Sequence, residues 1–132
     1  MYLLDTNICV YVIRQRPEAV FRRLSGAAGE QVAVSVITAF ELEVGASRAH
    51  GKQYSEAVRK FLAEIAVLPL EDSARHAYAR LRVDLERRGE VIGAHDMLIA
   101  AHALASEATL VTNNEKEFRR VRGLRIENWT AE

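Results

Sequence analysis

Short apolar runs alternate along this chain with longer segments in which apolar residues recur every three or four positions. A short apolar run is typical of a buried strand, and the wider spacing is typical of an amphipathic helix. The runs predict strands or short extended segments over 1–4, 32–35, 67–70, 109–112 and 124–126. The periodic segments predict helices over 6–14, 17–27, 37–48, 53–65, 72–88, 95–106 and 115–120. This alternation predicts an α/β fold, with a short central parallel sheet flanked by helices on both faces.

Proline and glycine residues indicate where several of these helices begin and end. Pro17 suits the first turn of the second helix. Gly26, Ala28 and Gly29 are expected to end that helix, and Gly89 to end the longest one. We find no internal repeat, low-complexity tract or linker, so we expect a single domain over 1–132.

The composition favours a cytoplasmic globular protein. The chain has 132 residues, of which 49% are hydrophobic, enough to bury a core without help from disulfides. No apolar run reaches the roughly 18 residues of a membrane span, and no basic segment precedes an apolar one as in a secretory signal. Cys9 is the single cysteine, which excludes a disulfide framework and fits a reducing compartment.

The formal net charge is zero, which argues against attraction of the whole protein to nucleic acid. Much of the positive charge is nevertheless arginine in clusters, and arginine is suited to phosphate contacts. The alternative is that these clusters are solvated helix faces with acidic neighbours. The clusters are Arg14 with Arg16, Arg22 with Arg23, Arg87 with Arg88, and Arg119 with Arg120, Arg122 and Arg125.

Four acidic residues lie where an α/β chain would turn them toward one pocket: Asp5, Glu41, Asp96 and Glu117. Asp5 directly follows the first predicted strand, and Glu117 comes soon after the strand over 109–112. In open parallel sheets, ligands bind beyond the carboxyl ends of the strands. Buried acids without cationic partners are costly, so a bound divalent cation or a retained proton is the usual explanation.

Asp5 and Asp96 each have a simpler structural explanation. Asp5 precedes a predicted helix and is therefore a candidate N-cap. Asp96 lies in a first helical turn, where a negative charge complements the helix dipole. The dipole does not explain why Asp96 falls on the apolar stripe of Ile99, Ala100 and Ala103, which is expected to face the core.

Glu41 and Glu117 also have alternatives to a functional role. Glu41 flanks a stripe formed by Ile37, Phe40 and Val44, and it would otherwise be a solvated surface residue. Glu117 stands three residues after Asn114, a spacing typical of a capping box.

The histidines give no sign of a zinc site, because they are not spaced as ligand pairs. His95 and His102 are predicted to turn away from the stripe that carries Asp96. Oxygen-only ligation by the four acids instead indicates a hard cation, Mg²⁺ or Mn²⁺.

Several motifs together resemble those of PIN-domain ribonucleases, and specifically the VapC toxins of bacterial VapBC toxin–antitoxin pairs. They occur in the expected order and spacing over nearly the whole chain. The motifs are Leu4-Asp5-Thr6-Asn7, Ser35-Val36-Ile37-Thr38-Ala39-Phe40-Glu41-Leu42 with Gly45, Gly93-Ala94-His95-Asp96-Met97-Leu98-Ile99-Ala100, Leu110-Val111-Thr112-Asn113-Asn114 with Glu117-Phe118, and Gly123-Leu124-Arg125-Ile126-Glu127-Asn128-Trp129.

The resemblance implies a three-layer, Rossmann-like PIN domain with a Mg²⁺- or Mn²⁺-dependent endoribonuclease site. Its acids would be Asp5, Glu41, Asp96 and Glu117. In our hypothesis, Asp5 and Asp96 hold the principal ion, while Glu41 and Glu117 direct water or a second ion. Many relatives carry an aspartate directly after the fourth strand, where this chain has Asn113 and Asn114. The supporting polar groups would be Thr6, Ser35, Thr112 and Asn114.

The resemblance also implies partners and a cellular role. It implies a toxin that cleaves RNA and so inhibits translation and growth, a VapB-type antitoxin, a homodimer and a bacterial cytoplasmic location. Relatives with similar Asn113-Asn114 and C-terminal motifs act on the anticodon loop of initiator tRNA, which makes that RNA a candidate substrate.

Two other functions remain open from the residues alone. A phosphatase could use the strand-end Asp5 as its nucleophile, although such enzymes usually carry a second acid where this chain has Asn7. A catalytically silent α/β module that only binds a partner would cleave nothing and take up no Mg²⁺.

Overall fold

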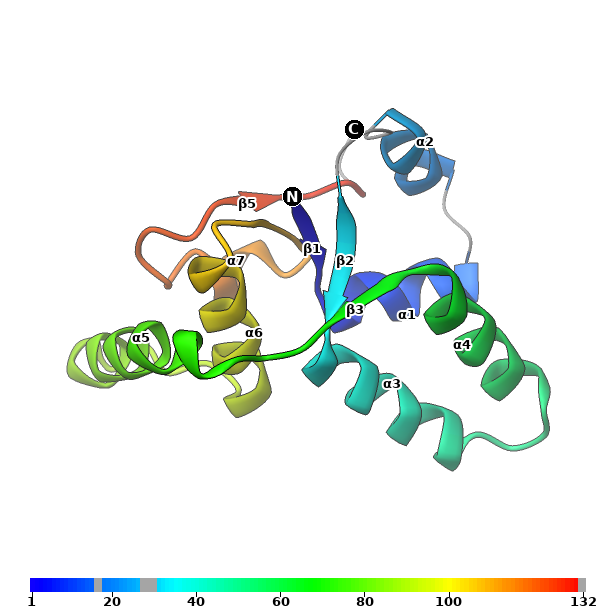
Figure 1. Cartoon of the computed structure of the whole chain (residues 1–132), viewed down its shortest axis with the longest axis horizontal. Coiled ribbons are helices and arrows are strands. Elements are labelled where there is room, and N and C mark those ends of the chain that lie inside the picture. Colours follow the sequence, from blue (N-terminus) through cyan, green and yellow to red (C-terminus); the bar gives the residue numbers. More distant parts are fainter. Residues whose placement is uncertain (16–17, 27–30, 131–132) are drawn as a thin grey trace.

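All strands of the computed structural model belong to one parallel sheet, as the alternating pattern predicted (Figure 1). The structure describes residues 1–15, 18–26 and 31–130. The strands are β1 (Tyr2–Leu4), β2 (Val32–Ser35), β3 (Ala66–Leu68), β4 (Thr109–Val111) and β5 (Ile126–Glu127), and their order in the sheet is β3-β2-β1-β4-β5. In the register of the central strand, Leu4 lies beside Val34 of β2 and Val111 of β4.

The helices follow the predicted segments closely. They are α1 (Thr6–Gln15), α2 (Glu18–Gly26), α3 (Val36–Arg48), α4 (Gln53–Glu64), α5 (Arg75–Arg88), α6 (Ala94–Ala105) and α7 (Glu115–Phe118). The segment predicted as one helix over 72–88 begins with a 3₁₀ turn, η1 (Asp72–Ala74), before α5. Gly89 ends α5 in the left-handed conformation, with φ of 66°, as expected for a glycine stop. The predicted roles of Pro17, Ala28 and Gly29 lie outside the described residues.

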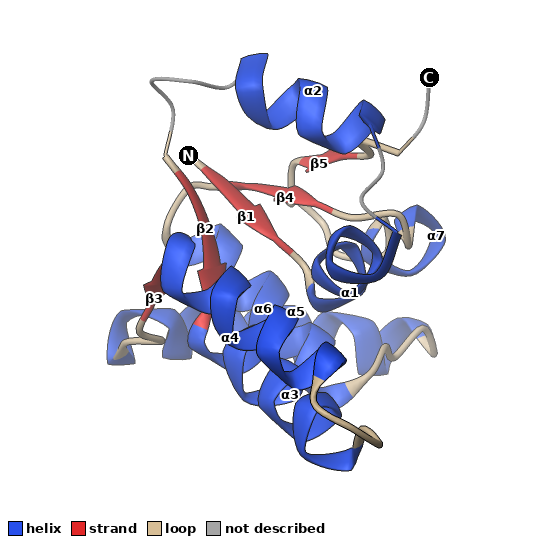
Figure 2. Ribbon diagram, turned by 90° about the vertical axis from the view of Figure 1, so that its right-hand side faces the viewer, coloured by secondary structure: helices blue, strands red, loops and turns tan. Residues whose placement is uncertain are grey.

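Two hydrophobic clusters cover the two faces of the sheet, so the fold has three layers (Figure 2). Adjacent residues of β1 point to opposite faces: Leu3 packs with α5 and α6, including Leu85 and Ile99. Leu4 packs with residues of α1, α3 and α4, including Ile8 and Val58. Both clusters are fully buried at these positions, which fixes the helices on either side of the sheet.

The strands β1, β2 and β4 all end at the same edge of the sheet, and a polar residue stands at or directly after the end of each strand. Asp5 follows β1, Ser35 ends β2, and Thr112 follows β4. The Asp5 N–H donates to the Val111 carbonyl at 3.0 Å, so a hydrogen bond directly joins the ends of β1 and β4. Within the described part of the chain, no helix is long and apolar enough to cross a membrane.

Candidate active site

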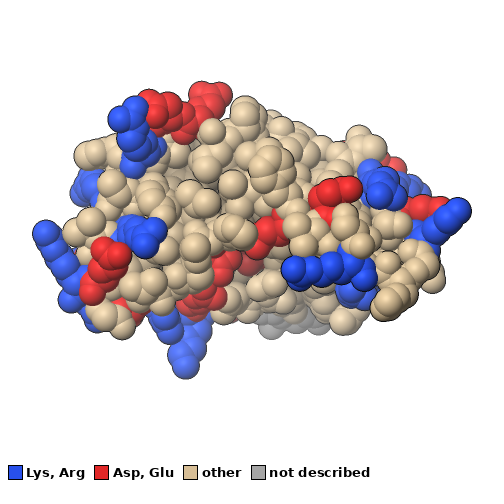
Figure 3. Space-filling model, turned by 90° about the horizontal axis from the view of Figure 1, so that it is seen from below, with Lys and Arg blue, Asp and Glu red and all other residues tan. Residues whose placement is uncertain are grey.

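The four acids named from the sequence come from four different elements and act on one another at the carboxyl edge of the sheet. Asp5 follows β1, while Glu41, Asp96 and Glu117 belong to α3, α6 and α7. The charges of Asp5, Glu41 and Glu117 all act on Asp96. Figure 3 views this edge and shows a band of acidic side chains across the middle of the face, with lysine and arginine side chains on either side. The fold therefore brings together residues more than a hundred positions apart.

Asp5 is almost completely buried, with 2% of its surface exposed. Its Oδ1 accepts the Ile8 N–H at 2.8 Å, so Asp5 does act as the N-cap of α1. Its Oδ2 accepts the Thr112 hydroxyl at 2.5 Å. Burial raises the pKa of Asp5 to about 6, against the opposing effect of the hydrogen bonds from Thr112 and Ile8. The Asp5 carboxylate therefore both caps α1 and belongs to the candidate site.

Asp96 and Glu117 are hydrogen-bonded to each other. Partial burial, and then the hydrogen bond and charge of Glu117, raise the pKa of Asp96 to about 7. Burial also acts to raise the pKa of Glu117, but hydrogen bonds with Asp96, Gly93 and Asn114 outweigh it, and the net direction is down. A hydrogen bond between two carboxyl groups needs a proton between them, and the raised pKa of Asp96 and the lowered pKa of Glu117 place that proton on Asp96 when no cation is bound.

The capping box predicted for Glu117 is wrong. The Asn114 N–H, which Glu117 would have accepted, donates instead to Thr112 Oγ1 at 2.9 Å. Glu117 accepts the Asn114 side-chain amide through Oε2 and the Gly93 N–H through Oε1, the latter at 3.1 Å. Glu117 is therefore held across the site by the segment before α6, and Gly93 is a contributor that the sequence did not reveal.

Glu41 is oriented by polar residues from two other helices and from its own. Its Oε1 accepts the Thr6 hydroxyl at 2.5 Å, and Thr6 Oγ1 lies 3.0 Å from Thr38 Oγ1. The other oxygen, Oε2, lies 3.2 Å from Nδ1 of the exposed His95. Thr38 and His95 were not identified from the sequence. The sequence signal that could have identified each was its position: Thr38 lies one helical turn before Glu41, and His95 lies directly before Asp96.

The prediction that Ile37, Phe40 and Val44 form the buried stripe beside Glu41 is also wrong in part. Phe40 and Val44 are 64% and 47% exposed, whereas Thr38, Leu42 and Ala46 form the buried face of α3. Large apolar residues suggested the wrong face, because the space beneath α3 is filled partly by small side chains. Glu41 therefore borders the buried face on the side of Thr38.

Ser35 lies under α3 and α6, and its hydrogen bonds do not involve the carboxylates. Its Oγ accepts the Ile37 N–H at 3.2 Å, which caps α3, and lies 2.8 Å from Nδ1 of His102. His102, which was predicted to turn away from the stripe that carries Asp96, is buried, with only 4% of its surface exposed. The helix α6 is buried around most of its circumference, so it has little outer face at this position. Burial lowers the pKa of His102.

The donor chemistry of the site fits a hard divalent cation. Asp5 and Asp96 form no ion pair with any lysine or arginine of the described residues, and all four groups offer carboxylate oxygens. A cation would offset the burial and the carboxylate repulsion that raise the pKa of Asp96. The site therefore matches a divalent cation in its charge and in the type of its donor atoms. Across the ranges that the structure describes, no group of three or more His, Cys, Asp or Glu side chains is placed so that it could hold a metal ion.

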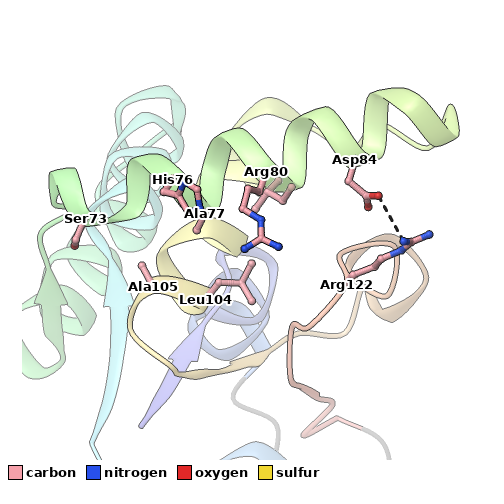
Figure 4. A pocket seen from close by; sticks show the side chains of 9 residues that line it. Ser73, His76, Ala77, Arg80, Asp84, Leu104, Ala105 and Arg122 are labelled. Carbon is pink, nitrogen blue, oxygen red and sulfur yellow. Dashed lines mark ion pairs between the residues drawn. The ribbon is translucent and has the colours of Figure 1, made fainter.

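A separate groove between α5 and α6 lies away from these acids (Figure 4). Its volume is about 500 Å³, and His76, Arg80 and Leu104 are among the side chains that line it. Figure 4 shows Arg122 reaching toward Asp84 on its wall, where Nη1 and Oδ1 form an ion pair at 3.8 Å. None of the four acids lines this groove, so it is not the candidate active site.

Comparisons with known proteins agree over almost the full length of the chain. The model of the PIN domain matches residues 2–124. Ribonuclease VapC2 of Rickettsia felis is 40% identical over 131 residues, 98% of each chain. The tRNA(fMet)-specific endonuclease VapC of Shigella flexneri is 36% identical over 130 residues, again 98% of each. The crystal structure of VapBC2 from Rickettsia felis bound to a DNA fragment from its promoter contains a chain that superposes with a TM-score of 0.92, at 41% identity, covering 97% of this chain and 98% of that one.

Proposed function

This chain belongs to the PIN-domain family and within it to the VapC ribonucleases, and we propose that it is a metal-dependent endoribonuclease, the toxin of a bacterial toxin–antitoxin pair. The observation that carries the proposal is the group of four carboxylates, Asp5, Glu41, Asp96 and Glu117, which act on one another at the carboxyl edge of the sheet. PIN-domain nucleases in general depend on divalent metal ions. We propose Mg²⁺ or Mn²⁺ here, because all the donors are oxygens.

In this proposal Asp5 and Asp96 hold the principal cation, and Glu41 and Glu117 direct the attacking water or a second cation. When bound, a divalent cation supplies a more acidic water molecule and neutralises charge on the attacked phosphate. The Thr112 hydroxyl and the Ile8 N–H fix both oxygens of Asp5, and the Thr6 hydroxyl fixes Glu41. Water adds to phosphorus and the bond to the 3′ oxygen breaks, which leaves a 5′-phosphate and a 3′-hydroxyl.

The proposed substrate is RNA, and initiator tRNA is the specific candidate. The relative from Shigella flexneri is named a tRNA(fMet)-specific endonuclease and is 36% identical to this chain. The shared length of the two chains supports extending that substrate to this protein. Cleavage of initiator tRNA would stop translation and growth, and such an activity requires a location in the bacterial cytoplasm.

We further propose a VapB-type antitoxin as partner, bound in an apolar groove formed by α1, α2, β2, α4 and the start of β3. Related structures are complexes of VapB with VapC proteins, which supports a protein occupant. The groove has a volume of about 490 Å³, with Lys60 and Glu64 among its lining residues. Its larger apolar lining residues are Val12, Ile13, Leu24, Val32, Phe61 and Ile65. Such a lining suits the apolar face of a partner helix.

A homodimer is proposed from a different surface. Phe40 and Val44 are exposed one turn apart on α3, and large exposed apolar side chains that adjoin one another favour an interface. The occupant we propose is a second copy of this chain. Sedimentation equilibrium of the purified protein tests the dimer, and Phe40→Ser is expected to shift the protein to a monomer.

The activity is tested with purified protein, RNA and Mg²⁺. We expect cleavage of initiator tRNA that stops in EDTA and falls by at least about 100-fold in Asp5→Asn and in Asp96→Asn, a loss typical of essential catalytic groups. Full cleavage in EDTA, or by either variant, would exclude the mechanism. A generic phosphomonoester serves as the control substrate, because turnover there and none on RNA would favour the phosphatase. Titration calorimetry with Mn²⁺ separates the enzyme from a silent binding module.

A further inference from the structure

The four acids create a problem for any RNA substrate, because the phosphate backbone is itself negatively charged. The chain has a formal net charge of zero, so it offers no general attraction to RNA. Positive charge must therefore be concentrated near the site if RNA is to bind beside it. The side chains that can supply it are cations that lie close to the acids and are not already neutralised by carboxylates.

We propose that a cationic hollow between the end of α5 and α7 binds the RNA phosphate backbone next to the bond that is cleaved, with Lys116 and Arg120 as the phosphate contacts. The inference rests on the proposed ribonuclease function and adds to it the surface that holds the substrate. The hollow has a volume of about 520 Å³ and is lined by Arg88, Gly89, Glu90, Lys116, Arg119 and Arg120. Four of these six residues are cationic and one is acidic.

The hollow adjoins the acidic group through α7. Lys116 directly precedes Glu117, and Arg120 follows it by one helical turn. Arg120 is also close enough for its charge to act on Glu117. Because the hollow and the fourth acid share this short segment, RNA held in the hollow would lie beside α7, which carries Glu117.

The segment around Arg120 is held at two points, so its guanidinium is directed rather than free. Arg120 Nη1 donates to the Val91 carbonyl at 3.4 Å. The carbonyl of Arg120 accepts a hydrogen bond from Arg88 Nη2. Arginine held in this way retains further N–H donors for a phosphate.

The cations of the hollow differ in whether carboxylates already neutralise them. Arg88 forms ion pairs with Asp84 and Glu90 at 2.7 and 3.4 Å, and Arg119 pairs with Glu115 at 2.7 Å. For Lys116 and Arg120, no ion pair with a carboxylate is formed within the described ranges. These two are therefore the groups with charge left for a phosphate.

Other exposed arginines are less suited to this role. Arg75 pairs with Asp72 at 2.7 Å, and Arg82 pairs with Glu86 at 3.3 Å. Arg80 lies in the α5–α6 groove of Figure 4, which none of the four acids lines. Arg80 is consequently a matched control, because it is exposed and cationic but belongs to a different hollow.

The test compares Lys116→Gln, Arg120→Gln, the double variant and Arg80→Gln on initiator tRNA over a range of salt concentrations. Removing one phosphate-binding cation is expected to reduce the slope of log affinity against log salt by about one. We expect a rise in KM of about three- to tenfold for each single variant, with kcat within about twofold of the parent. Arg120→Lys, which keeps the charge, is expected to recover most of the salt slope. Lys116 is exposed, so its variant tests the hollow without a cost to folding.

Several outcomes would overturn the inference. One is a double variant that cleaves RNA with the parent's KM and salt slope, and another is an Arg80→Gln effect as large as that of Lys116→Gln. A third is a double variant that keeps the parent's salt slope for RNA but binds the antitoxin more weakly. That result would show that the hollow binds an acidic segment of the antitoxin rather than RNA. A parent protein that binds RNA in the hollow without cutting it would refute the proposed activity and leave this inference standing.

Discussion

The backbone N–H of Gly93 donates to Oε1 of Glu117 at 3.1 Å and so ties the entry of α6 to α7. The same glycine also makes room for the carboxylates. A Cβ at position 93 would lie 3.1 Å from Oδ2 of Asp96 and 3.8 Å from Oε1 of Glu117. Gly93 therefore positions one acid by a hydrogen bond and accommodates a second by having no side chain.

Replacing Gly93 with alanine is expected to weaken cation binding and catalysis together. The backbone at this position has φ of −56°, which alanine adopts without strain, so the effect should come from the added methyl group. That group displaces the Asp96 carboxylate, and we expect kcat to fall at least about tenfold, a size typical of misplaced catalytic groups.

The measurement is titration calorimetry with Mn²⁺ alongside RNA cleavage. Gly45→Ala is the matched control, since a Cβ there would meet the Tyr54 ring at an ordinary 3.7 Å. A Gly93→Ala protein with the parent's Mn²⁺ affinity and kcat would show that the close approach to Asp96 has no consequence.

The raised pKa values of Asp5 and Asp96 predict how stability depends on pH without a divalent cation. Both carboxyls bind protons more tightly in the folded than in the unfolded protein, with pKa values of about 6 and about 7 against an ordinary 3.8. The stability they contribute is therefore complete below about pH 4 and is lost as the pH rises through about 6 and 7. For the buried Asp5 this loss is on the order of 3 kcal/mol.

Thermal unfolding in EDTA between about pH 5 and about pH 8 checks this dependence. We expect the midpoint to fall with rising pH in the parent and to change less in Asp96→Asn. Added Mn²⁺ should restore the midpoint most at the higher pH, because the cation binds the ionised carboxylates of the folded state. A midpoint that rises with pH in EDTA would show that these two carboxyls do not govern the pH dependence of stability.

Much of the fold could be predicted because it depends on local patterns, and these patterns also gave the place of each of the four acids within its element. Alternating apolar runs identify parallel strands, and Asp5 follows one of these runs directly. The partners of the acids could not be predicted in the same way, because they are set by how the elements pack. His95 meets Glu41 from 54 residues away, and Gly93 meets Glu117 from 24 away. No local pattern encodes these pairs.

The error at Glu117 has a specific physical cause. A capping box needs a free backbone N–H at Asn114, and the Thr112 hydroxyl already accepts that N–H. The spacing of Asn114 and Glu117 allowed a hydrogen bond from the Asn114 N–H to Glu117, but the Thr112 side chain competes for the same N–H. Glu117 was then available to the Gly93 N–H and to Asp96.

Ser35→Ala is expected to reduce stability without removing the cleavage activity. The substitution deletes the oxygen that caps α3 through the Ile37 N–H and leaves Nδ1 of the buried His102 without its partner. Losses of this kind cost about 1–3 kcal/mol. Chemical denaturation measures the cost, and RNA cleavage at low temperature measures the activity. A folded variant without activity would assign Ser35 to the acidic site.

Thr112→Val removes the hydroxyl that donates to Oδ2 of Asp5 at 2.5 Å, while preserving the shape of the side chain. The hydrogen bond favours the ionised carboxylate, so its loss should raise the pKa of Asp5 further above about 6. A protonated Asp5 binds a cation poorly, and the pH at which Mn²⁺ binding reaches half its maximum is expected to increase. Thr112→Ser keeps the donor and should retain the parent's pH dependence. Valine and serine variants with the same midpoint would show that the Thr112 hydroxyl does not control the ionisation of Asp5.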